Sequence, residues 1–460
     1  MASCSVLDHG ARADGSTLDT AAIQAAIDAC HAAGGGRVEF PGGRTVLAGA
    51  IELRDRVELH LAAGSVLRCA GNIAACHEHQ GRRAWSFIRA EEAEDCAITG
   101  GGTIDGNGRA FVEQLGDYLH ATKRPRPHTI LFDACRRVTV RGITIRDGAN
   151  WTLRLTGCVD VLVHGIRIYS DLRMPNCDGI DPDHCRSVRI SDCHIETGDD
   201  CICVKARREF PEYGPCEDIA ISNCVLKSTS CALMIGIEAQ AAMRNVVVDN
   251  CIIRGSNRGI GVHLAHECDV ERVLFNNCIV ETRLFEPSWW GCGEPIYVAA
   301  HAETPELGVG TVRDVRFSNI LCEGENGIYA IGTAEQPLRG IVFDRIRLAL
   351  RKHSRWPAGW QDRRPLDTSW QGGGASDTAG RLQHPTNGFF LEHVVGAVLR
   401  HCEVHWQGEP DPAFAHALEA HQVSELEVSD FRGTAARPDL PPVLLDRVTP
   451  AAPPLAVWDH

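Results

Sequence analysis

Two short acidic motifs contain the residues of this chain that are best suited to hydrolytic chemistry. Asn176 and Asp178 form the first motif, and Gly198-Asp199-Asp200 forms the second, with Asp199 lying 21 residues after Asp178. Crowded carboxylates raise one another's pKa, so one can stay protonated while its neighbours remain ionised. Such a set supplies the acid and the base that cleavage of a glycosidic bond requires. On spacing alone, a surface cluster of aspartates or a calcium site is an equally good interpretation.

An internal repeat explains how the two motifs could meet. Apolar residues recur at offsets of 3, 5, 8 and 10 positions from five starting points: Cys135, Cys158, Cys185, Cys216 and Met243. This pattern indicates two short strands separated by a bend. One such unit is too small to bury its inward face, so stacked units must share a continuous core. Leucine-rich repeats need shorter units with a Leu consensus, which is absent. We therefore predict an all-β solenoid, a parallel β-helix. Motifs one coil apart would then lie on the same face, about 5 Å apart along the axis.

The rest of the chain fits the same architecture. Less regular copies of the repeat occur around Val57, Ala97, Val273, Val315, Ile341 and Val398. We predict a single domain over residues 1–460, with a loop insertion at about 351–385 and an irregular tail at about 437–460. A helix at about 18–33 is expected to cap the N-terminal end, because apolar residues recur there at helical spacing. These residues are Ile23, Ala26, Ile27 and Cys30.

Asparagines and cysteines recur within the repeat. Asn223, Asn250 and Asn277 are 27 residues apart, which predicts side-chain amides stacked at a bend. The 21 cysteines lie within apolar strand patterns, and no Cys/His spacing resembles a zinc site. We therefore expect reduced, buried thiols and no metal or organic cofactor.

Composition limits the partners. The formal net charge of −14 argues against nucleic acid and against anionic membrane surfaces. No apolar run is long enough for a membrane helix. The N-terminal residues lack the basic and apolar regions of a signal peptide, so we expect a cytoplasmic location, or secretion if a leader has been removed. The sequence does not indicate an oligomeric state.

Residues 175–202 resemble the signature of glycoside hydrolase family 28, the polygalacturonase-like, pectin-degrading enzymes. The core of that signature is Asn-x-Asp followed by Gly-Asp-Asp. Two further motifs support the resemblance, Asp14-Gly15 with Asp19 and the stretch from Gly101 to Gly106. The resemblance runs from about residue 5 to about residue 406. It implies a right-handed, single-stranded parallel β-helix and an inverting hydrolase. In this family pattern Asp199 would be the general acid, while Asp178 and Asp200 would activate water.

Two motifs of the family are changed in this chain. Polygalacturonases carry Gly-His-Gly one or two coils later, where this chain has residues 230–236 without a histidine. They also carry an Arg-Ile-Lys that holds galacturonate carboxylates, and Gly261 and His263 occupy those basic positions here. The loss of the arginine removes a planar group suited to bidentate carboxylate binding. The resemblance therefore implies hydrolysis without fixing the sugar.

Several residues are candidates for substrate binding, each with a purely structural alternative. Paired tryptophans on a loop can stack on sugar faces, and His263 occupies the lysine position of the family motif. The predicted substrate-binding residues are Asn176, Lys205, Glu238, His263, Arg283, Trp289, Trp290, Glu294 and Tyr297.

We therefore predict a glycoside hydrolase acting on pectin-type or related oligosaccharides. Trp356 and Trp360 in the insertion could wall one end of the cleft, which would favour exo attack on short chains. A β-helix polysaccharide lyase and a non-catalytic carbohydrate-binding β-helix are the alternatives. Lyases typically use calcium and a basic residue, whereas pure binding needs no cluster of like charges.

Overall fold

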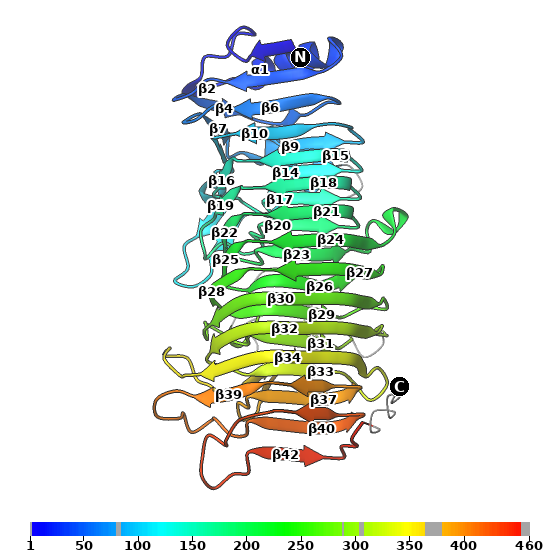
Figure 1. The fold of residues 1–460 in the computed structure, drawn as a ribbon. Coiled ribbons are helices and arrows are strands. Elements are labelled where there is room, and N and C mark those ends of the chain that lie inside the picture. Colours follow the sequence, from blue (N-terminus) through cyan, green and yellow to red (C-terminus); the bar gives the residue numbers. More distant parts are fainter. Residues whose placement is uncertain (1, 80–83, 288, 303–307, 364–379, 452–460) are drawn as a thin grey trace, which may run out of the picture.

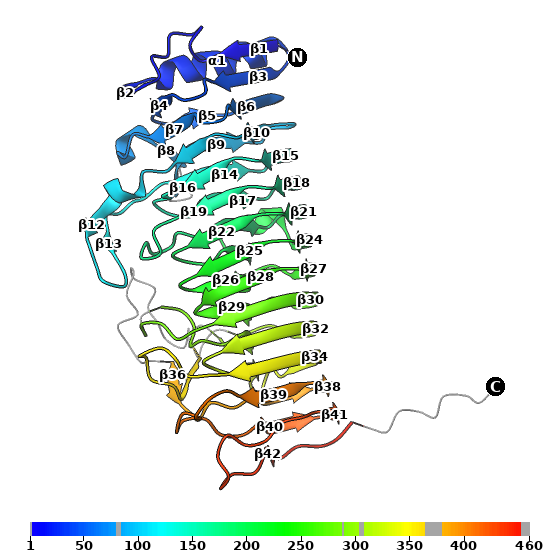
Figure 2. The same ribbon diagram turned by 60° about the vertical axis from the view of Figure 1, so that its left-hand side comes forward.

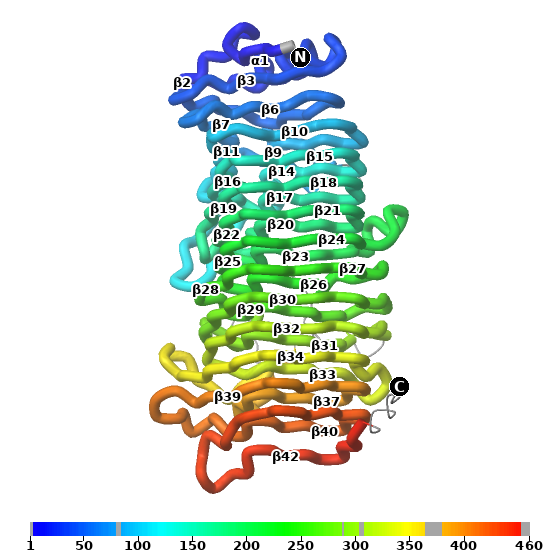
Figure 3. The backbone as a smooth tube through the Cα atoms, viewed as in Figure 1, coloured from blue at the N-terminus to red at the C-terminus, as the bar shows by residue number. Residues whose placement is uncertain are grey.

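The computed structural model describes residues 2–79, 84–287, 289–302, 308–363 and 380–451. Within these ranges the chain winds into an elongated right-handed parallel β-helix (Figure 1). One continuous 38-stranded sheet, almost entirely parallel, runs along the described length of the molecule. The tube in Figure 3 shows the coils stacked regularly from the N-terminal to the C-terminal end. The predicted fold class is confirmed.

Each coil contributes strands to three faces. The site face consists of β5 (Ile51–Glu52), β9 (Ala84–Glu91), β14 (His128–Asp133), β17 (Leu153–Thr156), β20 (Ile180–Asp183), β23 (Ile202–Ala206), β26 (Cys231–Ala239), β29 (Arg258–Leu264), β31 (Ile296–Ala300), β33 (Ile328–Ile331), β37 (Phe389–Val395), β40 (Leu418–Ser424) and β42 (Val443–Asp446). The antiparallel β8 (His77–His79) pairs with β9.

The other two faces follow the two halves of the repeat. The second face contains β1 (Ala2–Ser5), β3 (Gly36–Phe40), β6 (Val57–Leu61), β10 (Ala97–Gly100), β15 (Arg136–Arg141), β18 (Val159–His164), β21 (Arg186–Ser191), β24 (Cys216–Ser222) and β27 (Met243–Asp249). The third face contains β2 (Asp14–Leu18), β4 (Thr45–Ala48), β7 (Val66–Cys69), β11 (Thr103–Asp105), β16 (Thr144–Arg146), β19 (Arg167–Tyr169), β22 (His194–Thr197), β25 (Val225–Ser228) and β28 (Ile252–Ser256). Later coils join these two faces in the long strands β30 (Val270–Thr282), β32 (Val312–Gly324) and β34 (Leu338–Leu350), and then separate them into β38 (Val398–Arg400), β39 (Glu403–Trp406) and β41 (Glu427–Ser429).

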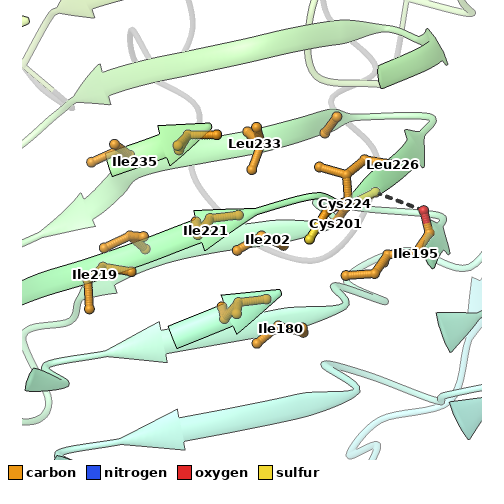
Figure 4. Packing of buried hydrophobic residues seen from close by; sticks show 14 of the residues in the cluster. Ile180, Ile195, Cys201, Ile202, Ile219, Ile221, Cys224, Leu226, Leu233 and Ile235 are labelled. Carbon is orange, nitrogen blue, oxygen red and sulfur yellow. Dashed lines mark hydrogen bonds between the residues drawn. The ribbon is translucent and has the colours of Figure 1, made fainter. Parts of the chain in front are cut away.

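The core consists of equivalent apolar residues from successive coils. Ile180, Ile202 and Leu233 pair in register on the site face and point inward together (Figure 4). Phe317 on β32 stacks between two phenylalanines of adjacent coils, with ring centroids 5.0 and 5.3 Å apart. The offset positions of the repeat are buried as well, as at Val188, Ile190, Cys193 and Ile195, so they mark further inward-facing positions of each coil.

The predicted asparagine ladder is confirmed in part. Asn223, Asn250 and Asn277 all adopt left-handed backbone conformations, with φ between 54° and 56°, which asparagine tolerates better than most residues. Asn250 donates to Asn223 across 2.7 Å, whereas Asn277 donates to Asp249. All 21 cysteines are unpaired thiols, and all except Cys4 and Cys76 are buried.

The predicted cap is α1 (Thr20–Ala32), two residues shorter at its start and one at its end than the expected 18–33. Its buried residues are the four that sequence spacing had indicated. Asp19 precedes the helix, and its carboxylate accepts hydrogen bonds from the backbone N–H groups of Arg12 and Ala13, at 2.9 Å each. Among the helices of the described residues, none is both long and apolar enough to cross a membrane.

Two regions expected to be irregular contain strands. The insertion at 351–385 forms an antiparallel pair, β35 (Trp360–Asp362) with β36 (Arg381–Gln383), and residues 364–379 lie outside the described ranges. Within the expected tail, β42 pairs in parallel with β40 as a further coil of the site face.

A second excursion, the hairpin of β12 (Val112–Gln114) and β13 (Ala121–Thr122), projects from the same side of the solenoid as β36 (Figure 2). Short 3-10 turns occur at Ile73–Ala75, Gly108–Phe111 and Pro211–Tyr213.

Candidate active site

The structure brings the three aspartates together where two strands of the site face begin. Asp178 precedes β20, and Asp199 and Asp200 precede β23 on the next coil. The pairing of Ile180 with Ile202 places Asp178 level with Asp200. One carboxylate oxygen from each of the three aspartates lies within 4.8 Å of the others. We call this group the aspartate trio.

A tight turn lets the two adjacent aspartates approach the same patch. A Cβ atom on Gly198 would lie 2.4 Å from the Met174 carbonyl oxygen, so only glycine fits there. Thr197 and Ser228 donate from their hydroxyls to the Asp199 carbonyl oxygen, at 2.7 and 2.6 Å. These contacts hold the chain in a bend. In a regular strand, the side chains of Asp199 and Asp200 would point to opposite faces, so the bend is needed for both to reach the same patch.

Asp199 has an environment that suits a general acid. Burial, followed by the neighbouring charges of Asp178 and Asp200, raises the pKa of Asp199 well above its usual range. Its two oxygens accept backbone hydrogen bonds from Asn176 at 3.0 Å and from Asp200 at 3.1 Å, which hold the carboxyl group in place. The side chain of Asn176 is engaged elsewhere, because its Oδ1 accepts from Arg126 at 2.9 Å.

Asp178 is subject to opposing effects of burial and of a cation. Burial and the nearby Asp181 carboxyl raise the pKa of Asp178 well above its usual range, and Lys205 opposes part of this shift from 3.5 Å. Burial also raises the pKa of Asp181 to about 8. Glu238, 3.4 Å from Lys205, is half-buried, and the cations Arg207 and Lys205 hold its pKa at about 2. Lys205 thus lies within ion-pair distance of three carboxylates, those of Asp178, Asp181 and Glu238.

Asp200 is held in a fixed orientation from the following coil. Its Oδ1 accepts hydrogen bonds from the Ser230 hydroxyl at 3.0 Å and from the Cys231 N–H at 3.1 Å. The trio's oxygens are close enough to ligate a metal ion. However, the Lys205 ammonium already supplies positive charge at Asp178, which makes a second cation there less favourable.

The trio lies in a cavity of about 680 Å³ on the site face. The coils N-terminal to the trio contribute Trp85, Arg124, Pro125, Arg126, His128, Asn150, Trp151 and Arg154. The trio's own coils contribute Asn176, Asp178, Asp199, Asp200, Lys205, Arg207, Glu209 and Phe210. The C-terminal coils contribute Ser230, Met234, Ile237, Glu238, Arg258, His263 and Trp290. Cavities of this size and mixed polarity are typical of small-ligand sites.

Trp151 is the lining residue that sequence reasoning most clearly missed. Its ring lies under three cations, with Lys205 Nζ at 4.5 Å, the Arg154 guanidinium at 4.9 Å and that of Arg207 at 5.1 Å from the ring centroid. Because Leu153 pairs with Ile180, Trp151 is level with Asp178 one coil away. Alignment of the repeats around β17 and β20 could have placed Trp151 at the site.

Five of the nine predicted substrate-binding residues line the cavity, namely Asn176, Lys205, Glu238, His263 and Trp290. The other four do not. The Arg283 side chain is exposed and stacks on Phe285 at 4.1 Å, while Trp289 is buried beside the cavity rather than within its lining. Glu294 and Tyr297 are also buried behind the lining.

A buried charge network explains the positions of Glu294 and Tyr297. Arg258 lies 3.2 Å from both Glu294 and Asp362, and its guanidinium stacks on the Tyr297 ring at 3.8 Å. The Tyr297 hydroxyl donates to the Asp362 backbone carbonyl at 2.6 Å. Asp362 also accepts from the Gly291 N–H at 2.8 Å, next to Trp290. This network links the insertion to the loop that carries Trp290, and it places Glu294 and Tyr297 outside the cavity lining, where sugar contact had been expected.

The expected tryptophan wall also has a different form. Neither Trp356 nor Trp360 lines the cavity. Trp356 instead packs edge-on against Tyr118 of the β12–β13 hairpin, with ring centroids 5.4 Å apart, and Arg355 stacks on both rings. The hairpin leads into Arg124, and the insertion supports the Trp290 loop, so the two excursions meet as a continuous rim beside the cavity.

A parallel β-helix with a carboxylate cluster in a cationic, tryptophan-lined cavity has the features of a carbohydrate-active protein. The sequence model of Glycosyl hydrolases family 28 matches residues 43–284, which is more than half of the chain. The chain belongs to this family.

Individual relatives agree with that assignment. A probable polygalacturonase of Vitis vinifera is 29% identical over 267 residues, covering 53% of this chain and 53% of its own length. The chain spans about half of the length of the curated relatives it matches. An exopolygalacturonase structure from Thermotoga maritima superimposes with a TM-score of 0.66 at 22% identity, covering 76% of this chain and 88% of that one. A family 28 exopolygalacturonase structure from Yersinia enterocolitica gives a TM-score of 0.64 at 16% identity, covering 98% of this chain and 79% of that one. At these identities the two structures support the fold.

Proposed function

We propose that this protein is an inverting glycoside hydrolase that acts on pectin-type oligosaccharides from a chain end. The observation that carries the proposal is the aspartate trio, which lines the cavity with Asp178 and Asp200 buried and Asp199 half-buried, and which has Lys205 beside it. Membership of family 28, the presence of polygalacturonases among its relatives, and the cationic lining beside the trio all support this substrate class.

Each member of the trio has a distinct part in the proposed reaction. Asp199, whose pKa is raised, donates its proton to the glycosidic oxygen as the bond to the leaving sugar breaks. Asp178 and Asp200 accept hydrogen bonds from a water molecule and remove its proton as it attacks the anomeric carbon. Asp178 and Asp200 both line the cavity, where their carboxyl groups can meet this water. Lys205 favours the ionised form of Asp178, which this role requires.

The trio's geometry makes stereochemistry a sharp test of the mechanism. Most inverting glycosidases place their carboxyl groups roughly 6.5–9.5 Å apart, whereas about 5 Å is usual for retaining enzymes. The trio is as close as a retaining pair, with oxygens within 4.8 Å. Inversion is nevertheless proposed, because the resemblance to family 28 implies it and because two carboxylates, rather than one, are available to hold a water.

The rim supports attack at a chain end. Tyr118 and Trp356 form this rim outside the cavity lining by joining two excursions, and the two residues are 238 positions apart in the sequence. A long polymer would have to pass this rim to be cut internally, whereas a chain end can enter the cavity directly. The cavity volume of about 680 Å³ also suits a short oligosaccharide.

Product release from end-labelled oligosaccharides tests the proposal. The panel contains oligogalacturonides, fragments that alternate galacturonate with a neutral sugar, and neutral oligosaccharides, with Asp199→Asn as the inactive reference. We expect monosaccharide release by the wild type alone. Ultraviolet absorbance from an unsaturated product would instead reveal a lyase. Binding to the panel without cleavage by either protein would favour the non-catalytic alternative.

A further inference from the structure

The charges lining the cavity are distributed unequally along the solenoid axis. N-terminal to the trio, the described lining contains Arg124, Arg126 and Arg154 and no carboxylate. Arg154 is paired with the fully buried Asp183 at 3.4 Å. Arg124 and Arg126 have no carboxylate within ion-pair distance in the described part of the chain, and Arg126 donates to two carbonyls and to Asn176.

These two arginines repel each other. Burial, followed by the charge of Arg124, lowers the pKa of Arg126 to about 10. A carboxylate bound between the two guanidinium groups would relieve this repulsion and form charge-assisted hydrogen bonds. The N-terminal end of the cavity therefore favours an acidic sugar.

The C-terminal end has the opposite preference. Its only cation in the described lining is Arg258, which Glu294 and Asp362 already neutralise at 3.2 Å each. The only carboxylate there is Glu238, which Arg207 and Lys205 keep ionised. Met234, Ile237 and Trp290 supply apolar surface. A second sugar carboxylate at this end would be desolvated without a free cation to receive it.

His263 defines what this end can bind. The residue is 1% exposed, and neither ring nitrogen has a hydrogen-bond partner among the described residues. Burial, His301 and Arg258 lower the pKa of His263 well below its usual range, so the ring is neutral. A neutral imidazole offers one donor and one acceptor, which match sugar hydroxyls better than a carboxylate.

We infer that the site is built for a linkage between an acidic sugar, bound at Arg124 and Arg126, and a neutral sugar, bound at His263 and Trp290. This inference rests on the proposed function and narrows its substrate class. His263 is then a specificity-determining residue that discriminates against a second uronic acid at the C-terminal end. The missing Arg-Ile-Lys motif becomes part of this specificity rather than a loss of function.

Charge-matched probes test the inference. Digalacturonide is compared with its two monomethyl esters, each of which removes the charge of one sugar and changes little else. We expect one ester to be cleaved with a kcat/KM at least about tenfold above that of digalacturonide, and the other at least about tenfold below it. His263→Lys should reduce or reverse the advantage of the favoured ester. His405→Lys, on the exposed part of β39, is the matched control and should preserve it.

The outcomes separate this inference from the proposed function. Slower cleavage of both esters would show that both sugars must be acidic and would overturn the inference while leaving a hydrolase. Equal cleavage of all three probes would overturn it as well. If no probe is cleaved and the wider oligosaccharide panel also fails, the proposed function itself is wrong. The wild-type comparison decides the matter even if His263→Lys does not fold.

Discussion

Replacing Lys205 with methionine removes the cation of the trio while keeping most of the side-chain volume. Lys205 Nζ lies 3.5 Å from Asp178 Oδ2. At an effective dielectric constant of about 20, two unit charges at this distance interact by about 5 kcal/mol. This value is an upper limit for Asp178 alone, because Asp181 and Glu238 share the same ammonium at 4.0 and 3.4 Å. One pKa unit corresponds to about 1.4 kcal/mol, so we expect the pKa of Asp178 to rise by at least about one unit.

The sign of the effect on activity follows from the role of Asp178. The lysine lowers the pKa of Asp178, and its removal raises that pKa further. An ionised base is then available only at higher pH, so the acidic limb of the kcat/KM profile should move upward by at least about one unit. We also expect kcat/KM at the wild-type optimum to fall by at least about tenfold. The assay is hydrolysis of the best substrate of the panel from about pH 3 to 8.

A matched variant separates this effect from a general loss of structure. Lys227→Met replaces a lysine on β25 of the third face, outside the cavity lining, and should leave the profile unchanged. Thermal unfolding should show a lower Tm for Lys205→Met, because the buried carboxylates Asp178 and Asp181 and the half-buried Glu238 lose their shared partner. A folded Lys205→Met enzyme with an unmoved acidic limb would refute the assigned role of Lys205.

Three further predictions concern the surroundings of the trio and the core. Gly198→Ala should abolish measurable hydrolysis and have a smaller effect on Tm, because the new Cβ collides with backbone at the turn before Asp199. Near-normal activity of this variant would show that the turn is not required. Asp362→Asn should raise KM more than it lowers kcat, since it weakens the support of the Trp290 loop by Arg258, and an unchanged KM would count against that link. Phe317→Ala should lower the free energy of unfolding by about 3–5 kcal/mol in chemical denaturation, because it opens a cavity within a phenylalanine stack. A decrease below about 1 kcal/mol would mean that the neighbouring coils close the gap.

The fold was predictable because the repeat fixes which residues face inward. The offsets found in the sequence correspond to the buried positions of each coil, and the helix over 18–33 was displaced by only one or two residues. The strands in the insertion and in the tail were missed for a physical reason. β35 and β36 have three residues each and pair only with each other, and β42 has four residues and pairs with β40, so these strands are too short to leave a periodic signal in their own segments.

The site was predictable where its residues follow the repeat. Asp178, Asp199 and Asp200 are brought together by the stacking of adjacent coils, as their spacing had indicated. The positions of the other site residues depend on contacts with residues far away in the sequence. Glu294 was drawn into an ion pair with Arg258, whose second partner lies in the insertion, and nothing local in the sequence reveals that contact. Trp151 was missed because its neighbours in the sequence carry no motif.

The stereochemistry of the first product tests the central claim most directly. The trio is proposed to protonate the leaving oxygen and to deliver a water in one displacement at the anomeric carbon. Proton NMR during the first minutes of cleavage by the wild type records which anomer forms before mutarotation, with Asp199→Asn as the inactive reference. The account predicts that the first signal is the anomer opposite to that of the cleaved linkage. A first product with the same configuration as the linkage would contradict it, and would identify one member of the trio as a covalent nucleophile.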